Sequence, residues 1–147
     1  MTEGTARQPA ILVSACLLGV RCNHLGAASP STAVQALAAD NRLVAFCPET
    51  VGGLPTPRPA AERQSDGRMR TADGVDVTDA YRRGAEAAVA MAQAVSAPRA
   101  VLKARSPSCG CHQVYDGSFS RTLVEGDGVT AEALRAAGVQ VASEEDL

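Results

Sequence analysis

Four short apolar runs alternate with helical segments along this chain, and that alternation restricts the possible fold more than any other feature of the sequence. The apolar runs cover residues 11–15, 43–46, 100–102 and 139–142. Each run has the length and composition of a buried strand. Strands that alternate with helices pair in parallel and connect through right-handed crossovers. We therefore predict an α/β fold in which a mainly parallel sheet is flanked by helices in a Rossmann-like arrangement.

Three helices are predicted between these strands. They are 33–39 after a cap at Ser31 or Thr32, 79–95 after a cap at Asp76 or Thr78, and a short helix capped by Thr130 and ended by Gly138. Residues 52–74 are rich in proline and glycine and show no helical or strand period. A loop of this length inside a compact domain is uncommon and usually functional. We therefore predict that 52–74 is an irregular active-site loop.

Length and charge restrict the organisation of the protein and its partners. The 147 residues fit one domain, and we expect a flexible tail over 1–10 and a single α/β domain over 11–147. A net charge of −2 and an aromatic content of 3% argue against a nucleic-acid surface. No apolar stretch precedes Ile11, and the run that follows is too short to span a bilayer. We expect a cytoplasmic protein without a membrane partner.

Cysteines are the clearest sign of chemistry in this sequence. They are Cys16, Cys22, Cys47, Cys109 and Cys111. Their odd number argues against a secreted disulfide framework. Cys16, Cys47 and Cys109 each lie past the end of a predicted strand. Because the carboxyl ends of parallel strands meet at the ligand-binding edge of a sheet, we expect these three cysteines to converge.

Three converging cysteines are compatible with several roles. Buried cysteines often act as small hydrophobic residues. Structural zinc sites and thioredoxin-like redox pairs normally use C-x2-C spacings, and none occurs in this sequence. Three thiolates from distant loops suit an iron–sulfur cluster, in which three protein ligands leave one iron open as a Lewis acid. The spacing favours the cluster, with buried cysteines and a zinc domain as alternatives.

Polar residues beside these cysteines are candidates for catalysis. Glu49 follows Cys47 by two residues and is either a general acid or base, or a solvated loop or capping residue. Ser106 and Ser108 precede Cys109. They are either turn residues or hydrogen-bond donors to a substrate or to cluster sulfides.

Four other polar residues are interpreted as surface groups. His24 and His112 are the only histidines in the chain, and we interpret both as surface residues. Arg58 and Glu62 are expected to pair with each other inside the loop over 52–74. A surface pair of this kind carries little energy and no functional information.

Longer motifs in this sequence resemble those of one known family. The motifs are VSACLLG over 13–19, CPE over 47–49, GGLPTPR over 52–58, GVDVT over 74–78, LK over 102–103, SPSCG over 106–110, YDG over 115–117 and GDGVTA over 126–131. Together they resemble the thiouracil desulfidase family, also called domain of unknown function 523. The resemblance extends over about residues 11 to 145, which is nearly the whole chain.

The resemblance implies an enzyme that removes sulfur from a thiolated pyrimidine such as 2- or 4-thiouracil. It implies an oxygen-sensitive 4Fe–4S cluster held by Cys16, Cys47 and Cys109, and therefore a machinery that loads this cluster. It also implies catalytic roles for Glu49 and Ser106. We interpret the reaction as non-redox hydrolysis that releases sulfide. The alternative is a non-catalytic redox sensor or sulfide carrier, which would need neither Glu49 nor Ser106.

Two segments depart from the pattern of that family. Residues 22–26 read Cys-Asn-His-Leu-Gly, where the family usually has a Cys-Arg-Tyr-Asp-Gly-like stretch, and this difference affects the expected substrate preference rather than the cluster. Cys111 and His112 replace small residues after the Ser-Cys-Gly motif. They are either spare ligands or residues without a role.

Overall fold

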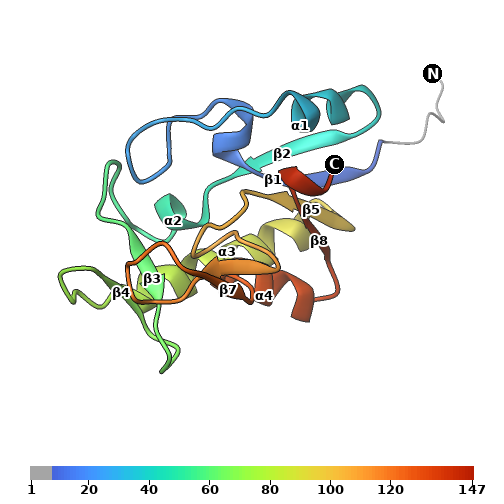
Figure 1. Cartoon of the computed structure of the whole chain (residues 1–147). Coiled ribbons are helices and arrows are strands. Elements are labelled where there is room, and N and C mark those ends of the chain that lie inside the picture. Colours follow the sequence, from blue (N-terminus) through green and yellow to red (C-terminus); the bar gives the residue numbers. More distant parts are fainter. Residues whose placement is uncertain (1–7) are drawn as a thin grey trace, which may run out of the picture.

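A four-stranded parallel sheet forms the centre of the molecule. The computed structural model describes residues 8–147, so most of the tail predicted over 1–10 lies outside the described residues. The strands of the sheet are β1 (Ala10–Ser14), β2 (Arg42–Phe46), β5 (Arg99–Leu102) and β8 (Gln140–Ser143). Their order across the sheet is β2-β1-β5-β8, and all neighbours are parallel. The predicted α/β architecture with a parallel sheet is confirmed (Figure 1).

Helices cover both faces of this sheet. They are α1 (Thr32–Ala36), α2 (Pro48–Val51), α3 (Thr78–Ala94) and α4 (Val129–Ala136), with short 3-10 helices η1 (Ala15–Leu18), η2 (Leu37–Ala39) and η3 (Glu144–Asp146). None of the helices that the structure describes is long and apolar enough to cross a membrane. In Figure 1, α1 lies on one side of the sheet, and α3 and α4 lie on the other. The second strand, β2, is thus added on one side of β1, and the later strands β5 and β8 are added on the other side. Such a change in strand order opens a crevice at the carboxyl ends of the strands.

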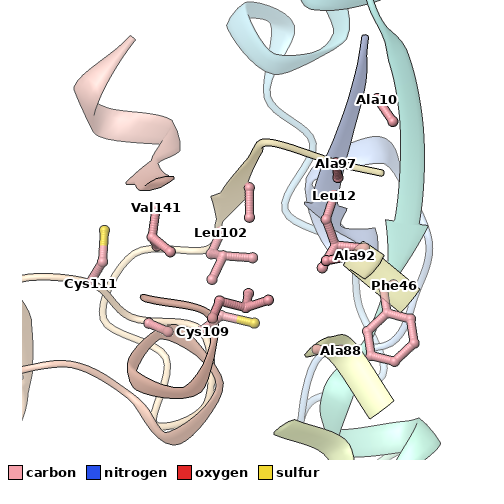
Figure 2. Packing of buried hydrophobic residues seen from close by; sticks show 13 residues of the cluster. Ala10, Leu12, Phe46, Ala88, Ala92, Ala97, Leu102, Cys109, Cys111 and Val141 are labelled. Atoms are coloured by element: carbon pink, nitrogen blue, oxygen red, sulfur yellow. The ribbon is translucent and has the colours of Figure 1, made fainter. Parts of the chain in front are cut away.

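β1 is buried on both faces, as its uninterrupted apolar sequence requires. Ile11 and Val13 pack with Val34 of α1. Leu12, which points to the opposite face, belongs to the same cluster as Ala88 of α3 (Figure 2). Full burial of one such aliphatic side chain stabilises the fold by about 1.5–3 kcal/mol. This two-sided core holds β1 in place, and with it the segment that follows its carboxyl end.

Two short hairpins occur where only loops were predicted. The hairpins are β3 (Ala61–Arg63) with β4 (Met69–Thr71), and β6 (Gln113–Tyr115) with β7 (Leu123–Glu125). Strands of three residues are too short to show a periodic pattern, so tertiary packing decides them. Met69 illustrates this, because it is fully buried beside Tyr81 of α3. The prediction of an irregular loop was therefore wrong for the second half of 52–74.

Two threonines that were predicted as helix caps, Thr78 and Thr130, make other contacts instead. The Asp76 carboxylate accepts a hydrogen bond from the Thr78 backbone N–H at 2.9 Å. However, α3 begins at Thr78, whose hydroxyl accepts a hydrogen bond from the Met69 backbone N–H. Thr130, the predicted cap of α4, is a fully buried residue inside that helix, and its hydroxyl lies 2.7 Å from that of Ser108. Both threonine hydroxyls are buried, and a buried hydroxyl requires a partner, which here comes from another element.

Two glycines allow α2 to pack very close to α3. A Cβ atom on Gly84 of α3 would lie 2.0 Å from the carbonyl oxygen of Pro48. A Cβ atom on Gly52, just after α2, would likewise lie 2.0 Å from the carbonyl oxygen of Ala80. No side chain fits at either position without moving the opposite backbone. This contact holds the segment that follows β2 against α3.

Candidate functional site

A cavity of about 400 Å³ opens at the carboxyl ends of β1, β2 and β5. Its volume falls within the range of roughly 300–1,000 Å³ that small-molecule sites occupy. Its position is the one that the strand order favours. The wall of the cavity contains all the predicted site residues, namely Cys16, Cys47, Glu49, Ser106 and Cys109.

The three predicted ligands reach this cavity from three different strand ends. Cys16 lies in η1 directly after β1, Cys47 lies between β2 and α2, and Cys109 lies in the turn after β5. Burial raises the pKa of Cys16 to about 11, against a smaller opposing effect of Lys103. Burial also raises the pKa of Cys109, with smaller contributions from Cys16 and Cys47. The Cys109 thiol is therefore close enough to the other two cysteines to respond to their charge.

A fourth cysteine, Cys22, lines the same cavity, although it was not among the predicted site residues. Cys22 is buried, and the Cys47 thiol donates a hydrogen bond to its carbonyl oxygen at 3.8 Å. Burial raises the pKa of the Cys22 thiol to about 12, and the neighbouring Cys47 raises it as well. The chain folds back after η1, because the Ser29 backbone N–H donates to the Cys16 carbonyl at 2.9 Å. Cys22 lies far from any strand end, so its sequence position gives no sign of this placement.

The donor set fits an iron–sulfur cluster. Thiolates from distant loops are the usual ligands of such clusters, and soft sulfur donors select iron–sulfur clusters over hard cations. The raised pKa values of Cys16 and Cys109 mean that both thiols are protonated near neutral pH in the metal-free protein. Both would lose their protons on binding iron. The cavity is also larger than a single metal ion needs.

Glu49 forms a buried ion pair that was not predicted. Arg58 Nε lies 2.8 Å from Glu49 Oε1, and the two side chains are only 4% and 12% exposed. Burial lowers the pKa of Arg58, but the charge and hydrogen bond of the carboxylate outweigh burial and raise it overall. The expected pair between Arg58 and Glu62 is wrong. Glu62 Oε1 instead accepts hydrogen bonds from the backbone N–H groups of Gly117 and Phe119.

The Arg58 guanidinium is anchored on several sides. Its Nη2 donates to the Cys22 carbonyl at 2.7 Å, and its Nη1 donates to acceptors in residues 55–56. On the α3 side, Tyr81 lines the same cavity, and burial raises its pKa, with a smaller contribution from the Glu49 charge. Glu49 is thus paired with a guanidinium that is itself held in one position.

Ser106 shapes the turn that carries Cys109. Its Oγ accepts hydrogen bonds from the backbone N–H groups of Ser108, at 3.2 Å, and Cys109, at 3.0 Å. This is the turn role predicted for a serine at this position. Within residues 8–147 the Ser106 hydroxyl donates to no protein acceptor, so its proton can be directed into the cavity. Ser108 is fully buried against Thr130 and lies outside the cavity wall.

The two histidines occupy different surroundings. Both are exposed, as predicted, but only His24 lines the cavity. Asn23 lines it as well. The departing segment 22–26 therefore contributes to the cavity wall, whereas His112 lies outside it.

Comparisons with known proteins cover nearly the whole chain. The model of the family described as 2-thiouracil desulfurase matches residues 11–146. An uncharacterized protein of Bacillus subtilis (strain 168), YbbK, is 39% identical over 146 residues, which are 93% of this chain and 97% of that protein. A solved structure of the [4Fe-4S]-dependent thiouracil desulfidase TudS is 45% identical, with a TM-score of 0.88. The superposition covers 95% of this chain and 93% of the TudS chain.

Proposed function

This chain belongs to the 2-thiouracil desulfurase family, and we propose that it hydrolyses a thiolated pyrimidine with the help of a [4Fe–4S] cluster. The observation that carries the proposal is the cavity in which Cys16, Cys47 and Cys109 meet the paired carboxylate of Glu49. The TudS desulfidase, 45% identical to this chain, depends on such a cluster. In the proposed reaction a thiocarbonyl and one water molecule give a carbonyl and hydrogen sulfide, so no electron donor is required.

Cys16, Cys47 and Cys109 would hold the cluster and leave one iron without a protein ligand. When bound, such a cluster supplies a Lewis acid that polarises the carbon–sulfur bond. Cys22 is outside this ligand set, although it neighbours Cys47. Its burial and its hydrogen-bonded carbonyl indicate a supporting role in the wall.

Glu49 is the proposed general base. Arg58 holds one carboxylate oxygen at 2.8 Å and thereby orients the side chain within the cavity. A water molecule transfers a proton to Glu49, and its oxygen attacks the thiocarbonyl carbon. General base catalysis of this kind typically contributes about 10²–10⁴-fold to the rate. Arg58 acts through Glu49 and is therefore a positioning residue.

Ser106 is the proposed hydrogen-bonding partner of the substrate. Its Oγ is fixed by two backbone N–H groups of the turn. The hydroxyl proton therefore has a defined direction. It either donates to the pyrimidine ring or passes to the departing sulfur as the carbon–sulfur bond breaks. In the second case the proton that Glu49 took from water restores the serine hydroxyl.

The first test is sulfide release by anaerobically reconstituted protein. We expect sulfide from 2- or 4-thiouracil, together with the visible absorbance of the cluster. Cys16→Ala, Cys47→Ala and Cys109→Ala should each lose this absorbance, while Cys111→Ala should keep it, because Cys111 lies outside the cavity wall. Intact absorbance in Cys109→Ala would contradict the ligand set. A fully loaded wild type without sulfide release from any thiopyrimidine would instead indicate a redox sensor or sulfide carrier.

The second test separates the chemistry from cluster binding. Glu49→Gln should keep the cluster absorbance and lose turnover by about 10²–10⁴-fold, because an amide accepts no proton from water. Ser106→Ala should lose about 10²–10³-fold, as expected for one hydrogen-bonding group near a transition state. Glu125→Gln on the exposed strand β7 is the matched control and should behave like the wild type. A wild-type rate in Glu49→Gln would exclude Glu49 as the base.

A further inference from the structure

A second group of metal-binding side chains lies outside the cavity. Ligand atoms of Cys111, His112 and Asp146 all lie within 4.8 Å of one another. None of these residues belongs to the cavity wall. We propose that they form a separate zinc site, which links the C-terminal helix η3 to the segment that carries Cys109.

The site is built from the segments that follow two neighbouring strands of the central sheet. Cys111 and His112 follow Cys109 in the segment after β5, and Asp146 lies in η3, directly after β8. β5 and β8 are parallel neighbours, so their carboxyl ends lie side by side. In Figure 2 the sulfur atoms of Cys109 and Cys111 point in different directions. The two cysteines therefore serve different surroundings, although only Gly110 separates them.

Hydrogen bonds hold the proposed ligands close to their binding positions. The His112 backbone N–H donates to Asp127 Oδ1 at 3.1 Å, and His112 has a φ of +73°, which is uncommon for a residue with a side chain. Asp146 Oδ2 accepts a hydrogen bond from the Ser143 backbone N–H at 2.8 Å. A carboxylate has a second oxygen, which can bind a cation while the first keeps this bond. Little backbone ordering is then needed when the metal binds.

The ligand types favour zinc over the common hard cations. Zinc is bound in proteins by cysteine, histidine and carboxylate ligands, whereas magnesium and calcium require oxygen ligands. Zn–S and Zn–N bonds of about 2.3 Å and 2.0–2.1 Å place the ligand atoms of a tetrahedral site about 3.5 Å apart. The separations within 4.8 Å thus need an adjustment of about 1 Å, which the exposed His112 and Asp146 side chains can make. Water would occupy the fourth position.

The surrounding charges are already paired, apart from the ligands themselves. Arg135 Nε lies 2.8 Å from Asp127 Oδ2, and Glu144 pairs with Lys103 at 3.1 Å. A dication bound by the Cys111 thiolate and by one carboxylate forms a neutral unit. Metal binding, with loss of the thiol proton, therefore removes the single negative charge of Asp146 from this edge of the sheet.

The test measures zinc and iron together in cluster-loaded protein under argon. Samples are dialysed against buffered zinc, and both metals are counted per chain. We expect one zinc per chain in the wild type at unchanged iron content. Asp146→Asn and Cys111→Ala should each weaken zinc binding by more than about 100-fold. Loss of a residue that only hydrogen-bonds a ligand weakens binding by about 10–100-fold. The thermal midpoint should rise with zinc in the wild type and not in these variants, because only the folded state holds the three ligands together.

The matched control removes the same charge from the same helix. Glu145 is the neighbour of Asp146 in η3, and its carboxylate pairs with Arg105 rather than with the proposed site. The control variant is Glu145→Gln. It should bind zinc like the wild type. Asp146 is exposed, so its variant folds even if the buried Cys111→Ala is unstable. Equal zinc binding by wild type and Asp146→Asn would overturn the proposal, as would zinc uptake only at the expense of iron.

Discussion

The ion pair on the β2 side of the cavity is buried, whereas the pair between Arg105 and η3 on the β5 side is exposed to solvent. The β2 side rests on Gly84 of α3 and on the pair between Arg58 and Glu49. On the β5 side, Arg105 pairs with Glu145 of η3 at 2.7 Å, and these side chains are 34% and 52% exposed. Exposed pairs contribute little individually, while a buried charge that loses its partner is costly. The proposed base therefore depends on a buried partner whose loss is costly.

The β5 side carries Ser106 and Cys109. Close packing holds this turn, because a Cβ atom on Gly128 would lie 2.4 Å from the Ser108 carbonyl oxygen, and the buried hydroxyls of Ser108 and Thr130 hold it as well. The exposed ion pair to η3 adds to these contacts, as does the Glu144 carboxylate, which accepts a hydrogen bond from the Ala104 backbone N–H at 2.7 Å. The comparison predicts that loss of the buried ion pair has a large effect and that loss of the exposed ion pair has a small one.

Arg58→Ala removes the buried ion pair and should have the largest effect. It leaves Glu49 buried without its partner, which typically costs about 3–5 kcal/mol in the free energy of unfolding. Urea denaturation of the metal-free protein measures this loss. The double variant Arg58→Met with Glu49→Met should recover most of it, because apolar residues of similar volume replace a buried pair at little cost. An unfolding free energy of Arg58→Ala equal to that of the wild type would contradict the comparison.

Gly84→Ala should have the next largest effect. The new Cβ would lie 2.0 Å from the Pro48 carbonyl, so α2 must move away from α3. We expect a destabilisation of about 1–3 kcal/mol, as for other overpacked sites. In a helix without such a contact the same change stabilises by about 0.5–1 kcal/mol. The sign of the change in the urea midpoint therefore decides whether this contact exists.

Glu145→Gln should have the smallest effect, and it tests the exposed ion pair with Arg105. The hydrogen bond to Arg105, with its charge, lowers the pKa of Glu145 below its ordinary value of 4.5. Because the folded-state pKa is the lower one, the stabilisation is present above pH 4.5 and is lost as the pH falls through the folded value. The difference in thermal midpoint between wild type and variant should vanish in acid. It should also shrink at high salt, which screens exposed pairs. A difference that survives both conditions would show that this pair is not solvent-exposed.

The parts of the site that could be predicted from the sequence are those that follow strands. Cys16 and Cys47 directly follow apolar runs, and the edge rule for parallel sheets then places them together. Cys22 and Arg58 could not be found in this way, because tertiary contacts determine the paths of their loops. The Arg58 backbone N–H, for instance, donates to the His24 carbonyl at 2.9 Å, across 34 positions of the chain. No local pattern encodes such a contact.

The predictions of Thr78 and Thr130 as helix caps were wrong for a related reason. Thr130 lies two residues after Gly128 and precedes a helical pattern, which is a typical capping context. Its partner, however, is the buried Ser108 hydroxyl at 2.7 Å, and burial of two hydroxyls together outweighs a local cap. Short strands such as β3 could not be predicted, because three residues show no periodic pattern. Sequence patterns thus describe the long elements and the residues next to them, while side chains between elements follow the packing.

Because β1 lies between β2 and β5, the first strand to be synthesised is also one whose pairing is completed late. During translation β1 can pair with β2 early, but its other edge stays open until residues 99–102 arrive. The third cysteine comes later still, at position 109. A donor that acted on the growing chain would meet an incomplete set of thiols beside an unpaired strand edge, which is a hazard for misassembly. The complete set of proposed ligands therefore exists only after position 109 has been synthesised, when about three quarters of the chain is already made.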